Sequence, residues 1–201
     1  MKLAVYKLCK TFFVFALVLN GLSVLAQTDT IVKKQRKVDS LMLDNPKYYL
    51  MLDGMVYQSA VSENGKQKAL DSVMIRVLNE TDFTMDKRFT KKGRCAIKLP
   101  LGKKYTIEFS KKGYVSKIIG VNTIVPRYDT FVSVFPFDID LFREEPELDV
   151  AVLSEPIAKI NFNNFNKTFD YDYNYTVKVN NNIKKLYAEY YRLQKLKKEK
   201  K

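Results

Sequence analysis

Short stretches in which apolar and polar residues alternate recur through the middle of the chain, and turn residues such as Asn64-Gly65 separate them. Alternation places successive side chains on opposite faces of a strand. The predicted strands cover residues 48–58, 73–78, 84–90, 95–99, 105–109, 115–121 and 131–141, with 84–90 a weak edge strand. Strands spaced by roughly ten residues are typical of an all-β sandwich. Within the first strand, Gly54 indicates a bulge or a bend.

Residues 91–122 contain three of these alternating runs, separated by turns on Gly93, Gly102 and Gly113. Glycine is favoured in tight turns because it adopts positive φ without steric cost. The region is therefore predicted to be a β-meander. Each turn carries a lysine pair: Lys91/Lys92, Lys103/Lys104 and Lys111/Lys112.

The C-terminal part is predicted to contain one more strand and a helix. Residues 142–181 form a β extension in which Phe169–Val179 alternates strictly between apolar or aromatic and polar positions. From Asn182, a candidate N-cap, apolar residues recur at helical spacing. Residues 182–201 are thus predicted to form a short basic amphipathic helix that frays into a lysine-rich tail.

The first 26 residues have the pattern of a signal peptide. A basic start without acids precedes a mostly apolar run at 11–25, and Val24-Leu25-Ala26 fits a cleavage site before Gln27. The alternative is a retained membrane anchor, although the run is shorter than the ~20 residues that a span needs. We expect export to the periplasm or the cell surface, with peripheral membrane association an open alternative. Residues 27–47 are polar and predict a tether, and residues 48–141 form the predicted sandwich.

The net charge and the cysteines indicate which partners and which covalent links to expect. The net charge is +13, and loss of the signal segment, with three lysines and no acid, would leave 175 residues at +10. A basic exported protein favours an acidic protein, an acidic glycan or an anionic membrane surface, but lysine also simply promotes solubility. Only Cys95 would remain after cleavage, so no disulfide within the chain is expected. Its place in an alternating run predicts a core residue.

The segment from Leu50 to Asn122 resembles the carboxypeptidase regulatory-like domain, a transthyretin-like (prealbumin-like) antiparallel β-sandwich common in exported proteins of the Bacteroidota. The resemblance rests on the LDGMVYQ strand, on the spacing of Leu99, Gly102 and Tyr105, and on the pair Gly113-Tyr114. Phenylalanine is often found in that family where this chain has Cys95. The resemblance implies a fold with many uses, so it does not imply a function.

Catalytic, metal and cofactor sites are not predicted. The sequence has no histidine, which excludes Ser-His-Asp and Cys-His mechanisms and any zinc site built on imidazole. Asp170, Asp172 and Asn174 have the spacing of an EF-hand start, but Tyr175 replaces the required glycine. The carboxylate pairs Asp138/Asp140 and Glu144/Glu145 are interpreted as solvated strand edges.

Two groups of side chains are candidates for contact with a partner. In a meander, alternate turns lie at the same end, so Lys91, Lys92, Lys111 and Lys112 would form one basic cluster. The second group is Tyr187, Tyr190 and Tyr191 on the predicted helix, which would otherwise pack on the chain's own sandwich.

These features predict a non-catalytic protein of the cell envelope that mediates protein–protein contact or scaffolding. The alternative is a glycan- or peptidoglycan-binding module, in which exposed tyrosines would stack on sugars. Nucleic acid is not an expected partner because the chain lacks an arginine-rich or stacking motif.

Overall fold

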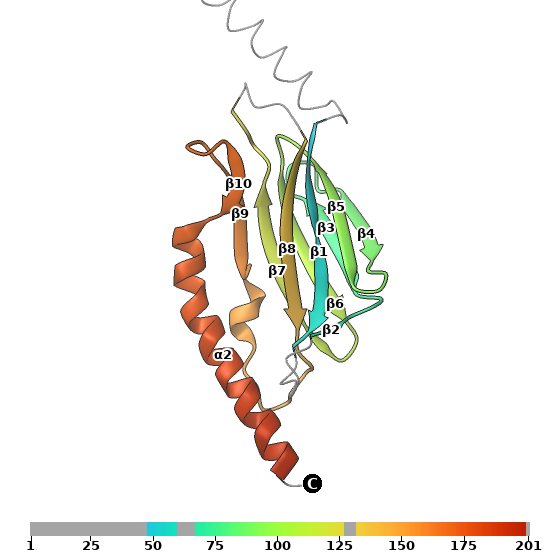
Figure 1. Cartoon of the computed structure of the whole chain (residues 1–201), viewed down its shortest axis with the longest axis vertical. Helices are drawn as coiled ribbons and strands as arrows, with labels where there is room; N and C mark the ends of the chain where they lie inside the picture. Colours follow the sequence, from blue (N-terminus) through green and yellow to red (C-terminus); the bar gives the residue numbers. More distant parts are fainter. Residues whose placement is uncertain (1–47, 60–66, 127–131, 200–201) are drawn as a thin grey trace, which may run out of the picture. The chain divides into compact units, whose positions relative to one another are not determined.

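A computed structural model describes residues 48–59, 67–126 and 132–199. The predicted signal peptide and tether lie outside these residues. The elements are β1 (Tyr49–Gln58), β2 (Lys68–Ala69), β3 (Met74–Asn79), β4 (Met85–Phe89), β5 (Arg94–Pro100), β6 (Lys104–Lys111), β7 (Tyr114–Asn122), β8 (Ser133–Leu141), the 3-10 helix η1 (Ala151–Ser154), β9 (Ala158–Asn163), β10 (Thr168–Tyr171) and α2 (Tyr173–Glu199). Two β-sheets and one C-terminal helix confirm the predicted fold class (Figure 1).

The first sheet is organised around β1. One edge of β1 pairs with β8 along its length, from Leu50↔Ser133 to Gln58↔Leu141, and this pairing is parallel. Both β5 and β2 pair with β1 in antiparallel fashion. The second sheet has the order β10-β9-β7-β6-β3-β4, and its β7–β9 pair is also parallel. The predicted antiparallel sandwich therefore includes two parallel pairs, because alternation does not reveal strand direction.

The predicted meander is wrong at one step. Strand β5 belongs to the first sheet and β6 to the second, so the turn on Gly102 connects the two sheets. Thr123 holds this turn: its hydroxyl donates to the Pro100 carbonyl at 2.9 Å and accepts from the Lys103 N–H at 3.0 Å. Strands β5 and β6 bury their alternate apolar side chains in the shared core: Cys95, Ile97, Leu99, Tyr105, Ile107 and Phe109.

The predicted strand at 169–179 ends at Tyr171, because a helix begins two residues later. The Asp172 side chain accepts a hydrogen bond from the Tyr175 N–H at 3.0 Å, which is the geometry of a helix N-cap. Of the alternating aromatic residues, Phe169 is buried, whereas Tyr173 is 77% exposed. The helix is therefore long and starts well before the predicted cap at Asn182.

Helix α2 packs through a second, smaller core. Leu186, Tyr190 and Leu193 are buried against Phe142, Leu148 and Leu153, which follow β8 or belong to η1. In Figure 1 the helix runs beside β9 and β10, at the opposite end of the second sheet from β4. No helix in the part of the chain that the structure describes is long and apolar enough to cross a membrane.

Candidate interaction surfaces

The two predicted basic turns meet at Asp71. Its side chain accepts from the Lys92 N–H at 2.8 Å, and its carbonyl accepts from the Lys111 ammonium at 2.7 Å. The structure therefore brings both turns to one end of the sandwich, as the sequence predicted. Lys91, Lys92 and Lys112 are exposed, but the Lys111 ammonium already has a partner within the chain. The cluster is thus weaker as a site for anions than four solvent-facing lysines would be.

The three candidate tyrosines are largely used to dock the helix. Tyr190 is 4% exposed and stacks obliquely on Phe142, with ring centroids 4.8 Å apart. Tyr187 meets the edge of the same ring at 5.6 Å. Tyr191 is partly exposed, and its hydroxyl lies 3.1 Å from that of Ser59. In this arrangement Tyr190 is not accessible to a partner, and Tyr187 offers little surface to one.

A buried ion pair joins the helix to the sandwich. The Lys117 ammonium on β7 lies 3.0 Å from an Asp140 carboxylate oxygen on β8. The Tyr187 hydroxyl contacts both groups and lies 2.7 Å from each oxygen of Asp140. The Lys117 side chain is 2% exposed, against 31% for Asp140. The cluster therefore connects β7, β8 and α2, with the Lys117 ammonium buried and the Asp140 carboxylate partly open to water.

The pKa values in this cluster follow from the burial of each group and from the charges and hydrogen bonds beside it. Burial lowers the pKa of Lys117, and the nearby Asp140 carboxylate only partly opposes this effect. Burial acts to raise the pKa of Asp140, but the Lys117 charge and the Tyr187 hydroxyl outweigh it and hold this pKa below its usual range. Burial, followed by the Asp140 carboxylate, strongly raises the pKa of Tyr187. The three groups favour an ion pair with a neutral phenol.

Sequence reasoning missed this cluster, although one signal for it was present. Lys117 occupies the same face of its strand as Ile119 and Val121, which are both buried. A lysine at an inward position is almost never fully buried unless it is paired. The predicted solvated edge position of Asp140 is wrong, because α2 covers it and its side chain is 31% exposed. Its outward position on β8 did not reveal that a distant helix would cover it.

Strand β4 carries exposed apolar side chains on an edge of the second sheet. It is the last strand of the second sheet, and every residue of it is exposed. Just before it Phe83 is 78% exposed, and within it Met85 and Phe89 are 55% and 65% exposed. Exposed apolar groups of this size, gathered on one strand, mark interaction sites more often than isolated ones do. We call β4 together with Phe83 the β4 edge.

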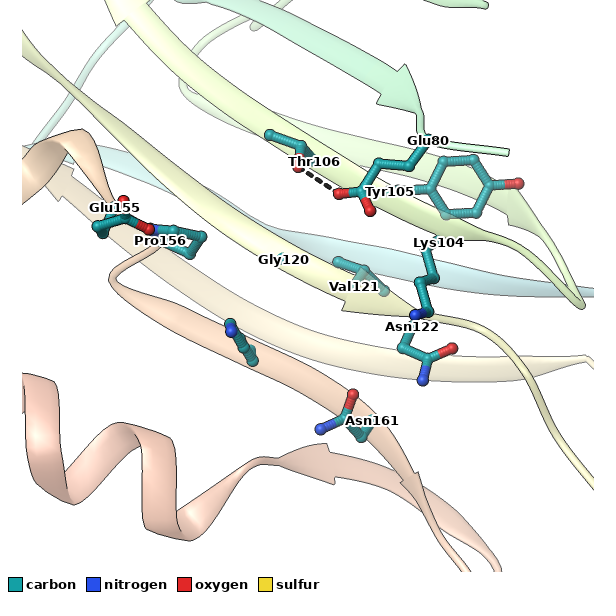
Figure 2. Close-up of a pocket in the computed structure, with 11 residues that line it drawn as sticks. Glu80, Lys104, Tyr105, Thr106, Gly120, Val121, Asn122, Glu155, Pro156 and Asn161 are labelled. Atoms are coloured by element: carbon teal, nitrogen blue, oxygen red, sulfur yellow. Dashed lines mark hydrogen bonds between the residues drawn. The ribbon is translucent and has the colours of Figure 1, made fainter. Parts of the chain in front are cut away.

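A shallow polar groove crosses the outer face of the second sheet (Figure 2). Its volume is about 340 Å³, and its lining includes Lys104, Thr106, Gly120, Asn122 and Asn161. The absence of a side chain at Gly120 leaves the groove floor open between β6 and β9. Figure 2 shows Glu80 at one side, where it accepts a hydrogen bond from the Thr106 hydroxyl at 2.6 Å. Ammonium, amide and hydroxyl groups in this arrangement can form hydrogen bonds with a polar ligand.

The remaining candidates have structural roles. Glu145 accepts from the Lys197 ammonium and thereby fixes the end of α2. Asp138 accepts from the Met55 N–H at 3.0 Å. Cys95 is 2% exposed, and burial raises the pKa of its thiol to about 12, which confirms its prediction as a core residue. In residues 48–59, 67–126 and 132–199, no cluster of acidic or cysteine side chains could hold a metal ion.

Comparison with known proteins adds little beyond the fold. No family model matches the chain, and no curated protein matches it. The resemblance to the carboxypeptidase regulatory-like domain is therefore supported only as far as a two-sheet β-sandwich.

Several solved structures are similar to about half of this chain. The Bacillus anthracis TIE protein is 19% identical over 48% of this chain and 18% of its own, with a TM-score of 0.36. A 3-chlorocatechol 1,2-dioxygenase from Rhodococcus opacus 1CP is 12% identical over 48% and 60%, with a TM-score of 0.33. The shaft pilin SpaA from Lactobacillus rhamnosus GG is 11% identical over 49% and 52%, with a TM-score of 0.32. Similarity this low carries no argument about the fold or the activity of this chain.

Proposed function

We propose that this chain is a non-catalytic module of the cell envelope that binds protein through the β4 edge. The observation that carries the proposal is the position of this strand. It pairs with β3 on one side, no other described strand pairs with its second side, and its apolar side chains face water. An edge strand of this kind can accept a strand from another chain, because its unpaired N–H and C=O groups direct the pairing.

Three further features support this assignment. The predicted signal peptide would deliver the protein to the envelope. The absence of histidine from the sequence removes the commonest general base and metal ligand. Most polar side chains of the buried cluster hydrogen-bond one another, so they serve to hold the helix and not to meet a substrate.

Capture from envelope extract tests the proposal. The mature chain, predicted to begin at Gln27, is compared with the double variant Met85→Lys/Phe89→Lys. Val134→Lys is the matched control, because Val134 is 61% exposed on β8, in the other sheet. We expect the wild type and the control to recover a stoichiometric protein partner. The double variant should recover at least about tenfold less, which corresponds to a loss of about 1.4 kcal/mol in binding.

Equal recovery by all three proteins would contradict a role for the β4 edge. Circular dichroism of each variant shows whether the sandwich remains folded. A partner that the mature chain retains through the basic turns instead would be released by salt, since exposed charges are largely screened at ~0.5 M.

The groove in Figure 2 favours glycan binding as a second candidate function. Gly120→Val would fill the groove floor, where a Cβ meets only the Lys159 side chain, at 3.5 Å. If the groove binds cell-wall glycan, sedimentation with purified peptidoglycan at ~0.5 M salt should retain the wild type. Under the same conditions, about tenfold less of the Gly120→Val protein should sediment with the peptidoglycan. Equal sedimentation of the two proteins would exclude this groove as the glycan site.

A further inference from the structure

The sequence of β4 is nearly symmetric in its chemistry. It reads Met85-Asp86-Lys87-Arg88-Phe89, with an apolar residue at each end and opposite charges on either side of Lys87. We propose that β4 pairs antiparallel with β4 of a second copy of this chain, centred on Lys87, so that the two six-stranded sheets become continuous. This inference rests on the proposed function, since it names the partner of the β4 edge.

The backbone of β4 presents the correct groups for this pairing. The Thr84 carbonyl accepts from the Asn79 N–H at 2.9 Å, and the Thr90 N–H donates to the Val73 carbonyl at 3.0 Å. Even-numbered residues of β4 therefore direct their polar backbone groups toward β3. N–H and C=O groups alternate in direction along a strand, so those of Met85, Lys87 and Phe89 point to the unpaired edge. In a register centred on Lys87 these three residues form the hydrogen-bonded pairs.

The charged residues are placed to select this register. Asp86 would lie opposite Arg88 of the second copy in non-hydrogen-bonded pairs, where opposed Cα atoms are only about 4.5 Å apart. In one copy alone, Arg88 Nε lies 2.7 Å from Asp86, and both side chains remain about half exposed. They can therefore exchange this contact for one between copies. A register shifted by two residues would place Asp86 opposite Asp86, or Arg88 opposite Arg88, and like charges directly opposite each other are destabilising.

The apolar residues are also matched in this register. Met85 would lie beside Phe89 of the second copy on the outer face of the sheet. On the same face, Met85 is already opposite Leu78 of β3, and Phe89 is opposite Met74. Pairing thus extends an apolar row across the two copies and removes exposed surface from water.

The Lys87 side chains of the two copies oppose association. They would lie opposite each other, and Arg76 of β3 is already opposite Lys87 within one copy. Lysine on an edge strand hinders uncontrolled pairing. The expected complex is therefore a reversible dimer that depends on concentration, and Lys87→Thr should strengthen it.

Disulfide trapping tests the register. In the Lys87→Cys variant, residue 87 of one copy would lie opposite residue 87 of the other. Their Cα atoms would be about 5.5 Å apart, which permits a disulfide. Met85→Cys lies opposite Phe89 and is the matched control. The buried Cys95 does not compete. The chain from Gln27 is used under mild oxidation. We expect Lys87→Cys to form disulfide dimers at least about tenfold faster than Met85→Cys, since the rate depends on how readily one thiol reaches the other.

Charge exchange supplies an independent test. Asp86→Arg should weaken dimerisation at least about tenfold in sedimentation equilibrium, and Asp86→Arg/Arg88→Asp should restore it, because the opposite charges are then exchanged but still matched. A wild type that stays monomeric up to ~0.5 mM, or a double variant that remains as weak as the single one, would overturn the self-pairing. If β4 variants then still lose an envelope partner, the proposed function stands and a different protein occupies this edge.

Discussion

Asp140→Ala is expected to lower the free energy of unfolding by about 3–5 kcal/mol, because it leaves the Lys117 ammonium buried without a counter-charge. The Lys117 side chain is 2% exposed, and without Asp140 its nearest polar partner is the Tyr187 hydroxyl. Most domains have only about 5–15 kcal/mol of stability in total, so this loss would be a large fraction of it. Urea denaturation followed by circular dichroism measures the change at constant temperature.

A double variant separates the charge effect from the packing effect. Lys117→Met/Asp140→Ala removes the buried charge together with its partner, so it should be more stable than Asp140→Ala. It should still lie below the wild type by about 1–3 kcal/mol, because the Tyr187 hydroxyl then lacks both of its partners. If the double variant is as unstable as Asp140→Ala, the ion pair is not the cause. If Asp140→Ala lowers the free energy of unfolding by less than about 1 kcal/mol, the variant does not contain an unpaired buried charge. Lys117 would then be neutral or would reach water.

The effect of pH has a defined sign. The pKa of Asp140 is lower in the folded protein than in the unfolded chain, so its ionised form adds stability above the unfolded value. This contribution decreases as the pH falls from the unfolded pKa, about 3.9, through the lower folded pKa. The difference in stability between the wild type and Asp140→Ala should therefore shrink on acidification in this range.

The positions of the strands could be predicted from the sequence, but the way they pair could not. Alternation located β5 and β6 because their inward residues are apolar and their outward ones are polar. The same pattern arises whether two strands lie in one sheet or face each other across a core. Here Leu101 is buried between them and Thr123 holds the turn, so the chain crosses from one sheet to the other. Such contacts with a distant residue are not visible in a local pattern.

The start of α2 shows how a local pattern can mislead. Residues 173–179 alternate like a strand, but Asp172 caps a helix, and the Tyr175 hydroxyl donates to the Pro156 carbonyl at 2.7 Å. The helix is held further along by the buried Leu186, Tyr190 and Leu193. Packing of this apolar stripe outweighs the strand preference of the tyrosines and valines at its start.

The candidate sites were predictable only in part. The sequence indicated both that 84–90 is an edge strand and that two basic turns share one end of the sandwich. It did not indicate that Phe83, Met85 and Phe89 would remain exposed, because the end position of β4 depends on the order of all six strands. Likewise, the groove over Gly120 arises only because β9, far along the chain, pairs with β7.

Gly54→Ala is expected to destabilise the protein by about 3 kcal/mol or more, the upper end for a residue that is too large for its site. Of the bulge or bend predicted at Gly54, the bulge is wrong: the strand pairs without interruption with Cys95 on one side and Phe137 on the other. A Cβ at Gly54 would lie 1.5 Å from the Phe137 carbonyl oxygen. Since this atom belongs to the backbone of β8, the two strands would have to separate.

Gly120→Ala is the matched control, because it makes the same change in another strand interior. Its Cβ would meet only Lys159 Cγ, at an ordinary 3.5 Å, so we expect a neutral effect or a gain of up to about 1 kcal/mol from lower entropy of the unfolded chain. Thermal denaturation should show Gly54→Ala melting roughly 6–12 °C below the wild type, given 2–4 °C per kcal/mol for a chain of this size. Equal melting temperatures for the two variants would mean that β1 and β8 are not in close contact at Gly54. The parallel pairing that fixes Asp140 beneath α2 would then have to be different.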